Sequence, residues 1–202
     1  MIRNIIFDLG NVLLSFKPEE YFDNNGYSED SKRTIISEIF KSREWAQIDN
    51  GEINITDAIE TISARSSLQT HEIAAVFNLR TKIIFPLAFN IKLLPVLKKH
   101  GFMLYFLSNF PDDIFDEVFN QYTFFKFFDG GIISARVKAS KPDGKIFRIF
   151  LEKYSLTPEE CLFIDDSEPN VTSAILTGMI GIHLRNPKEL SGQIEKVLNF
   201  KY

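Results

Sequence analysis

The chain has 202 residues, a mass of 23.3 kDa, 45% hydrophobic and 25% charged residues, and a formal net charge of −4. It can bury a core of its own, and because it has no basic excess and no long Lys/Arg block, we expect no nucleic-acid partner. We also expect a soluble cytoplasmic protein without membrane contact, because no secretory leader is evident and no apolar run approaches the roughly 18 residues of a membrane span.

The first predicted element is a buried strand that ends at Asp8. The residues before this acid are apolar without interruption, and the Gly10-Asn11 pair that follows it is a loop signal. In open α/β sheets, ligands bind at the carboxyl ends of the strands. Asp8 is therefore the first candidate for a site residue.

Residues 17–85 are polar and helical in period. Apolar residues recur at helical spacing in at least two stripes, one over residues 35–40 and one over residues 55–62. We predict an all-helical block of about four helices, with turns at Asn50-Gly51 and Ser66-Ser67. The single tryptophan, Trp45, falls in this block, where packing between helices is its expected use.

Strand and helix patterns alternate from residue 86 onward. The expected strands cover residues 102–107, 130–133, 161–164 and 180–184, and Asp143 is placed to cap the helix that begins after it. Alternation of this kind predicts an α/β fold, a doubly wound parallel Rossmann-like sheet. We therefore expect a core formed by residues 1–16 and 86–202, with residues 17–85 inserted as a helical cap over the carboxyl ends of the strands.

Polar residues follow several of these strands, and together they indicate a site. Ser108 ends one strand, the pair Asp165-Asp166 ends another, and Lys141 lies in a loop before a helix. The carboxylates of Asp8, Asp165 and Asp166 would repel one another strongly if no cation lay between them. Oxygen ligands with no nearby Cys or His suit Mg²⁺, and the ammonium group of Lys141 adds a second counter-charge. The set predicts a pocket for a phosphoryl group.

The ordered set resembles the four motifs of the haloacid dehalogenase superfamily. These motifs appear as Phe-Asp-Leu-Gly at residues 7–10, Leu-Ser-Asn at 107–109, Ser-Lys-Pro-Asp at 140–143 and Phe-Ile-Asp-Asp at 163–166. Each motif is weak alone, but their order is specific, and the resemblance spans the chain including the helical insert. Within the superfamily it is similar to the branch of sugar-1-phosphate phosphatases and the phosphatase domain of epoxide hydrolases.

The resemblance implies that Asp8 attacks phosphorus and becomes an aspartyl phosphate, with Mg²⁺ as cofactor. Lys141 would neutralise the nucleophile and the phosphate. The metal would be held by Asp8, the Gly10 carbonyl, Asp165 and Asp166. The phosphate oxygens would be bound by Ser108, Asn109 and Lys141.

One position departs from the pattern of most phosphatases in the superfamily. They carry a second Asp two residues after the nucleophile, which protonates the leaving oxygen, and this chain has Gly10 there. General acid catalysis is worth about 10²–10⁴-fold, so its loss needs an explanation. The substrate could have an acidic leaving group, as anomeric and acyl phosphates do, or the cap could supply an acid from Asp49 or Glu52. Phosphatase activity could also be absent.

The sequence thus predicts a Mg²⁺-dependent phosphatase that hydrolyses a small phosphorylated metabolite, with sugar phosphates among the candidates. One alternative is a 2-haloacid dehalogenase-type hydrolase. Dehalogenases also lack the second Asp, but they need no metal and carry no Asp-Asp pair in the fourth motif. The other alternative is a phosphate-binding or regulatory protein with negligible turnover. The sequence leaves the substrate and the oligomeric state open.

Overall fold

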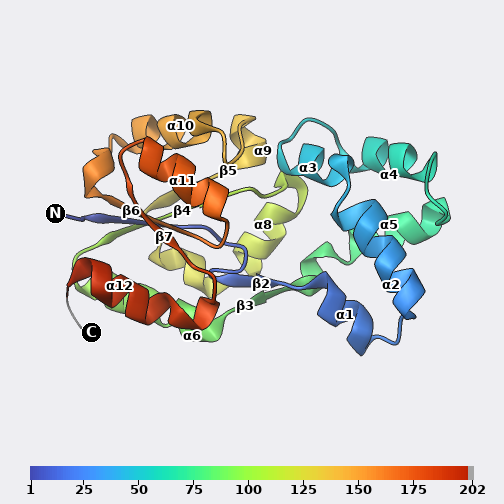
Figure 1. Ribbon diagram of the computed structural model, residues 1–202, viewed down its shortest axis with the longest axis horizontal. Helices are drawn as coiled ribbons and strands as arrows, with labels where there is room; N and C mark the ends of the chain where they lie inside the picture. The colour runs from blue at the N-terminus through green and yellow to red at the C-terminus, as the bar shows by residue number, and fades with distance from the viewer. Residues whose placement is uncertain (200–202) are drawn as a thin grey trace.

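The computed structural model describes residues 1–199 and contains a five-stranded parallel sheet flanked by helices (Figure 1). The strand order is β5-β4-β1-β6-β7, and every neighbouring pair is parallel. This confirms the predicted α/β fold. The strands are β1 (Asn4–Phe7), β4 (Met103–Ser108), β5 (Gly130–Ile133), β6 (Cys161–Asp165) and β7 (Ile180–His183).

Strand β1 lies at the centre of the sheet and is buried on both faces. Ile5 and Phe7 pack into one apolar cluster and Ile6 into another, because successive side chains of a strand point to opposite faces. Helices α9, α10 and α11 cover one face, and α6, α7 and α12 cover the other (Figure 1). Their bounds are α6 (Ala88–Ile91), α7 (Leu93–Lys99), α9 (Ser134–Val137), α10 (Gly144–Tyr154), α11 (Glu168–Leu176) and α12 (Leu190–Leu198).

The predicted cap of helix α10 is formed. The side chain of Asp143 accepts a hydrogen bond from the Lys145 N–H at 2.8 Å, which satisfies one of the free donors at this helix end. A short 3₁₀ turn from Pro158 to Glu160 leads into β6. Within residues 1–199, no helix has the length and apolar character to cross a membrane.

Five α-helices lie together beyond the carboxyl ends of the strands, and we call residues 17–83 the helical block (Figure 1). They surround an apolar cluster of their own, which includes Phe22, Ile39 and Ile62. A π-helical turn over residues 36–40 extends α2, so the second helix is longer than its α-helical part. The helices are α1 (Pro18–Asn24), α2 (Glu29–Ile35), α3 (Arg43–Asp49), α4 (Ile55–Ser63) and α5 (Thr70–Asn78).

A two-stranded antiparallel ribbon joins the helical block to the α/β part. Strand β2 (Leu14–Phe16) pairs with β3 (Ile84–Pro86), so the chain leaves and re-enters the α/β part side by side. The buried amide of Asn90 donates to the Val12 carbonyl at 2.7 Å and fixes the base of the ribbon. This ribbon was not predicted, because each of its strands has only three residues.

The helical block also contacts the α/β part at the turn after α3. The Ser134 hydroxyl, at the start of α9, donates a hydrogen bond to the Asp49 carbonyl. Gly51 has a φ of 67°, and a Cβ atom there would lie 2.6 Å from the Ala135 carbonyl oxygen. Only glycine allows this approach of two backbones, so residues 49–51 are held against α9.

Replacing Gly51 with alanine should destabilise this contact. Gly26 is a matched control, since it has a φ of 74° and open space where its Cβ would lie. We expect Gly26→Ala to cost about 1 kcal/mol because of its backbone conformation, and Gly51→Ala to cost at least about 1 kcal/mol more because of overpacking. Urea unfolding of both variants measures the difference, and equal losses would show that the turn does not press on Ala135.

Candidate active site

Three carboxylates meet at the carboxyl ends of β1 and β6. Asp8 follows β1, Asp165 ends β6 and Asp166 is the next residue; one oxygen of each lies within 4.8 Å of one oxygen of the others. Asp8 is 7% exposed and Asp165 is fully buried. Because β1 and β6 are parallel neighbours, the two strand ends bring these residues together, as the sequence analysis expected.

The ammonium group of Lys141 lies between two of these carboxylates. Its Nζ atom donates to Asp8 Oδ1 at 2.8 Å and to Asp165 Oδ2 at 2.6 Å, and the residue is 4% exposed. The side-chain amide of Asn109 donates to the Lys141 carbonyl and accepts from the Lys141 N–H, each at 2.9 Å. These two bonds hold the backbone of the lysine, and Asn109, which was expected to bind phosphate, also lines the cavity.

The charges of the cluster are only partly balanced. Burial raises the pKa of Asp8 to about 6, against the opposing attraction of Lys141. Burial also raises the pKa of Asp166, although a hydrogen bond from Asn11 opposes the shift. Burial disfavours the charge on Lys141, but the attraction of the Asp8 and Asp165 carboxylates is greater, and its pKa is raised. One ammonium group faces three carboxylates, so the oxygen donors have the charge and chemistry that suit a divalent hard cation.

Two asparagines that the sequence analysis missed orient the acidic pair. Asn170 donates to both oxygens of Asp165 at 3.1 Å, and Asn11 donates to Asp166 Oδ2 at 2.9 Å. Asn11 has a φ of 53° in the loop directly after the first strand. Asn170 lies in the first turn of α11, on the side that faces Asp165. In the sequence, Asn11 is visible only as a loop residue after the first strand, and Asn170 only as a residue five positions after Asp165. Neither fact predicts a hydrogen bond to the acidic pair unless the backbone geometry is known.

Ser108 and Gly10 lie beside the nucleophile candidate. Ser108 ends β4, is buried, and hydrogen-bonds Asp8, which lowers the pKa of that acid. Both residues line the cavity above the carboxylates. A Cβ atom at Gly10 would meet only Asp8 Oδ2, at an ordinary 3.7 Å. There is therefore space for a side chain at position 10, where most phosphatases of the superfamily have the second acid.

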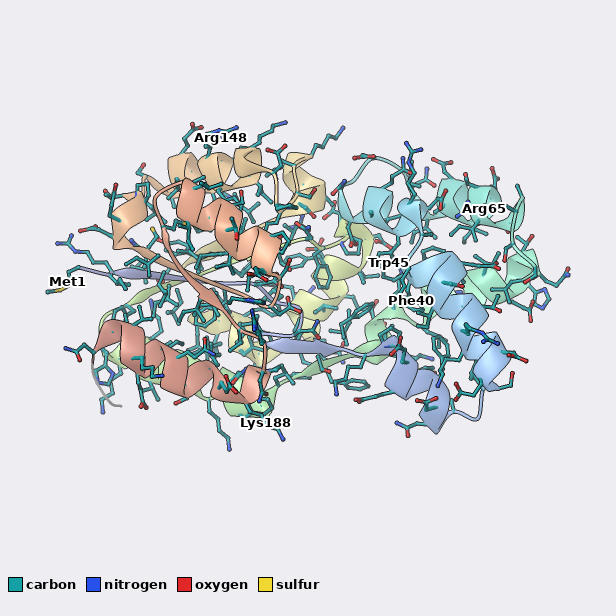
Figure 2. The ribbon with its side chains drawn as sticks, in the orientation of Figure 1. Met1, Phe40, Trp45, Arg65, Arg148 and Lys188 are labelled. Atoms are coloured by element: carbon teal, nitrogen blue, oxygen red, sulfur yellow. The ribbon has the colours of Figure 1, made fainter. Side chains whose placement is uncertain are left out.

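The cavity has a volume of about 190 Å³ and two chemically different ends. The charged cluster forms one end. The ring of Trp45, on α3, stacks on the ring of Phe77 with 5.9 Å between the ring centroids. Trp45 also lines the cavity, so it has a role beyond packing between helices. Figure 2 shows Trp45 and Phe40 on the side of the helical block toward the α/β part. The remaining apolar wall consists of Leu14, Phe16, Ile84, Phe110, Pro111 and Ile114.

The two candidate acids of the helical block lie in different places. Asp49 is half-buried and lines the cavity. Glu52 is exposed, accepts a hydrogen bond from the Asn50 side chain at 3.0 Å, and does not line this cavity. The buried residue Arg80, which the sequence analysis did not single out, also lines the cavity and forms an ion pair with the exposed Asp113. Of the two acids, only Asp49 is placed to meet a substrate.

Comparison with known proteins gives relatives over nearly the whole chain. The sesquiterpene phosphatase astK of Aspergillus oryzae is 31% identical over 179 residues, which cover 89% of this chain and 88% of that protein. The structure of the Bacteroides thetaiotaomicron enzyme BT-2542 in complex with magnesium and inorganic phosphate is 24% identical, with a TM-score of 0.70 over 90% of this chain and 93% of that chain.

A dehalogenase has a similar fold. The structure of L-2-haloacid dehalogenase from Xanthobacter autotrophicus, with chloropropionic acid covalently bound, is 17% identical, with a TM-score of 0.66 over 90% of this chain and 76% of that chain. At such identities these structures establish the fold alone. The sequence model of the haloacid dehalogenase-like hydrolases matches residues 2–178. The resemblance in the four motifs is thereby confirmed, and the chain belongs to the haloacid dehalogenase-like hydrolase family.

Proposed function

We propose that the protein is a Mg²⁺-dependent phosphatase that hydrolyses a phosphomonoester with a largely apolar organic part. The observation that carries the proposal is the position of Lys141 between Asp8 and Asp165, at the charged end of a cavity whose remaining lining is apolar apart from Asp49 and Arg80. A phosphoryl group fits the charged end, and the organic part of the substrate fits the apolar end.

The residues suited to hold the metal are those that offer oxygen atoms at the strand ends. Asp8 and Asp165 would bind it through carboxylate oxygens, Asp166 directly or through water, and Gly10 through its carbonyl. Bound Mg²⁺ would supply positive charge that neutralises the phosphate and the carboxylates. The unbalanced charge of the cluster supports this assignment. So does the relative BT-2542, whose structure contains magnesium and inorganic phosphate.

The chemistry assigned to the chain's own residues begins at Asp8. One of its carboxylate oxygens attacks phosphorus, the bond from phosphorus to the leaving oxygen breaks, and an aspartyl phosphate forms. Lys141 keeps the nucleophile in place and offsets the repulsion between two anions, while Ser108 and the backbone N–H groups of the first loop hold phosphate oxygens. Water then hydrolyses the intermediate, which releases inorganic phosphate and restores Asp8.

The apolar wall favours a hydrophobic substrate over a sugar phosphate. Sugar hydroxyl groups need hydrogen-bonding partners when buried, whereas Phe16, Trp45 and Phe110 offer apolar surface. The relative astK is named for a sesquiterpene, which is an apolar hydrocarbon skeleton. Residues 17–85 act in this proposal as the cap that selects the substrate, because Trp45 belongs to this segment.

Hydrolysis of an aryl phosphate, with Mg²⁺ and with a chelator, tests the function. We expect turnover with Mg²⁺, its loss on chelation, and a preference for prenyl or long-chain alkyl phosphates over sugar phosphates. A panel of 2-haloacids tests the dehalogenase alternative. Halide release that chelation leaves unchanged, without phosphate release, would overturn the proposal, and the absence of any turnover would favour a binding protein.

A further inference from the structure

Asp49 is the only acidic residue of the helical block that lines the cavity, within the part of the chain that the structure describes. It lines the same cavity as Asp8, Gly10 and Lys141, but it belongs to the helical block rather than to the sheet. A substrate whose phosphoryl group occupies the charged end would extend into the space that Asp49 lines.

The backbone of Asp49 is held in place by two independent contacts. The Ser134 hydroxyl donates to its carbonyl, and the Gly51 backbone packs on Ala135 with no room for a Cβ atom. Both contacts are with α9, which belongs to the α/β part. The backbone that carries the carboxyl group is therefore held against the α/β part, and a catalytic group requires such a fixed support.

The surroundings of Asp49 favour its protonated form. The charged groups that face it are Arg80 and Asp113, and Arg80 is already committed, since it pairs with Asp113 and donates to the Phe77 carbonyl at 2.8 Å. Burial is the largest influence and raises the pKa of Asp49 to about 7; Arg80 lowers it and Asp113 raises it. A carboxyl group with a pKa near the working pH can both donate and accept a proton.

We propose that Asp49 is the general acid and then the general base of the hydrolysis, in place of the carboxyl group that Gly10 lacks. This inference rests on the proposed phosphatase function. In the first step, an Asp8 oxygen bonds to phosphorus, the ester bond breaks, and the leaving oxygen takes the proton of Asp49. In the second, the Asp49 carboxylate takes a proton from water, whose oxygen bonds to phosphorus while the bond to Asp8 breaks. Inorganic phosphate leaves, and Asp49 is protonated again.

The test compares Asp49→Asn with Glu52→Gln on two substrates. An alkyl phosphate needs protonation of its leaving oxygen, whereas 4-nitrophenyl phosphate does not. We expect Asp49→Asn to lower kcat/KM by about 10²–10⁴-fold for the alkyl phosphate and by less than about 10-fold for the aryl phosphate. Glu52→Gln removes an acid from the same turn but outside the cavity, and it should match the wild type on both.

A second signature follows from the loss of the base. With 4-nitrophenyl phosphate, the folded Asp49→Asn variant should release a burst of nitrophenol equal to the enzyme concentration, because the aspartyl phosphate forms but hydrolyses slowly. Equal losses of kcat/KM on both substrates in a folded variant would overturn the assignment of Asp49. Wild-type inactivity on both substrates with Mg²⁺ would instead refute the phosphatase function itself.

The wild-type pH profile decides the matter even if the variant does not fold. An acid must be protonated to act, so kcat/KM for the alkyl phosphate should fall as the pH rises through about 7, the pKa of Asp49. The aryl phosphate does not need this proton, and its kcat/KM should not show the same fall. Profiles that superimpose for the two substrates would overturn the proposal.

Discussion

Asp8→Asn is expected to lower phosphatase activity by at least about 10⁴-fold while the protein stays folded. An amide cannot form the acyl phosphate, so the covalent step is lost. The fold should persist, because Lys141 keeps its ion pair with the fully buried Asp165. Inorganic phosphate should bind at least as well as to the wild type, since the neutral amide no longer repels it.

Asp143→Asn is the matched control for this variant. It makes the same chemical change near Lys141, but at an exposed helix cap where Asn and Asp serve about equally well. Steady-state kinetics, thermal unfolding and phosphate titration complete the comparison. Mass spectrometry of quenched wild type should find one phosphoryl group on Asp8. Full activity in Asp8→Asn would refute the nucleophile assignment.

Lys141→Met is expected to remove activity and to destabilise the metal-free protein by about 3–5 kcal/mol. The variant leaves the carboxylates of Asp8 and Asp165 buried with no cation between them. Without the lysine, burial raises the pKa of Asp8 beyond its present value of about 6. The loss of stability should therefore be greatest above that pH and should shrink as the carboxylates become protonated at lower pH.

Urea unfolding with and without Mg²⁺ measures this effect. Mg²⁺ should recover part of the lost stability, because a divalent cation at the carboxylates replaces the missing positive charge. Lys145→Met is the control, since Lys145 is exposed four residues later. If Lys141→Met proved no less stable than Lys145→Met at neutral pH without Mg²⁺, the ammonium group of Lys141 would not be required to stabilise the buried carboxylates.

The sequence predicted the sheet well because its strands have strong local patterns. The apolar run of β1 and the acids at the strand ends needed only the rule that parallel strands share a carboxyl edge. The ribbon of β2 and β3 could not be predicted, since three-residue strands have no resolvable period. Its two strands lie on either side of the helical block in sequence, and only the folded chain pairs them.

The parts of the site that the sequence could not predict depend on contacts between distant segments. Asp49 resembles any acid at a turn until the Gly51 backbone is seen against Ala135. The contact of the Asn109 amide with the backbone of Lys141 joins residues that are 32 positions apart, and no local pattern indicates it. Residue types predicted the chemistry of the site, but the use of each side chain depended on the docking of loops.

The central place of β1 also has a consequence for how the chain folds. Its residues 4–7 pair with residues 103–106 on one side and 161–164 on the other, so both partners lie far away in sequence. Sheets built from such distant pairings form slowly, because long loops must close before any contact rewards them. During synthesis, the apolar β1 strand emerges before both of its neighbours, and until they follow it is open to aggregation and to chaperone binding.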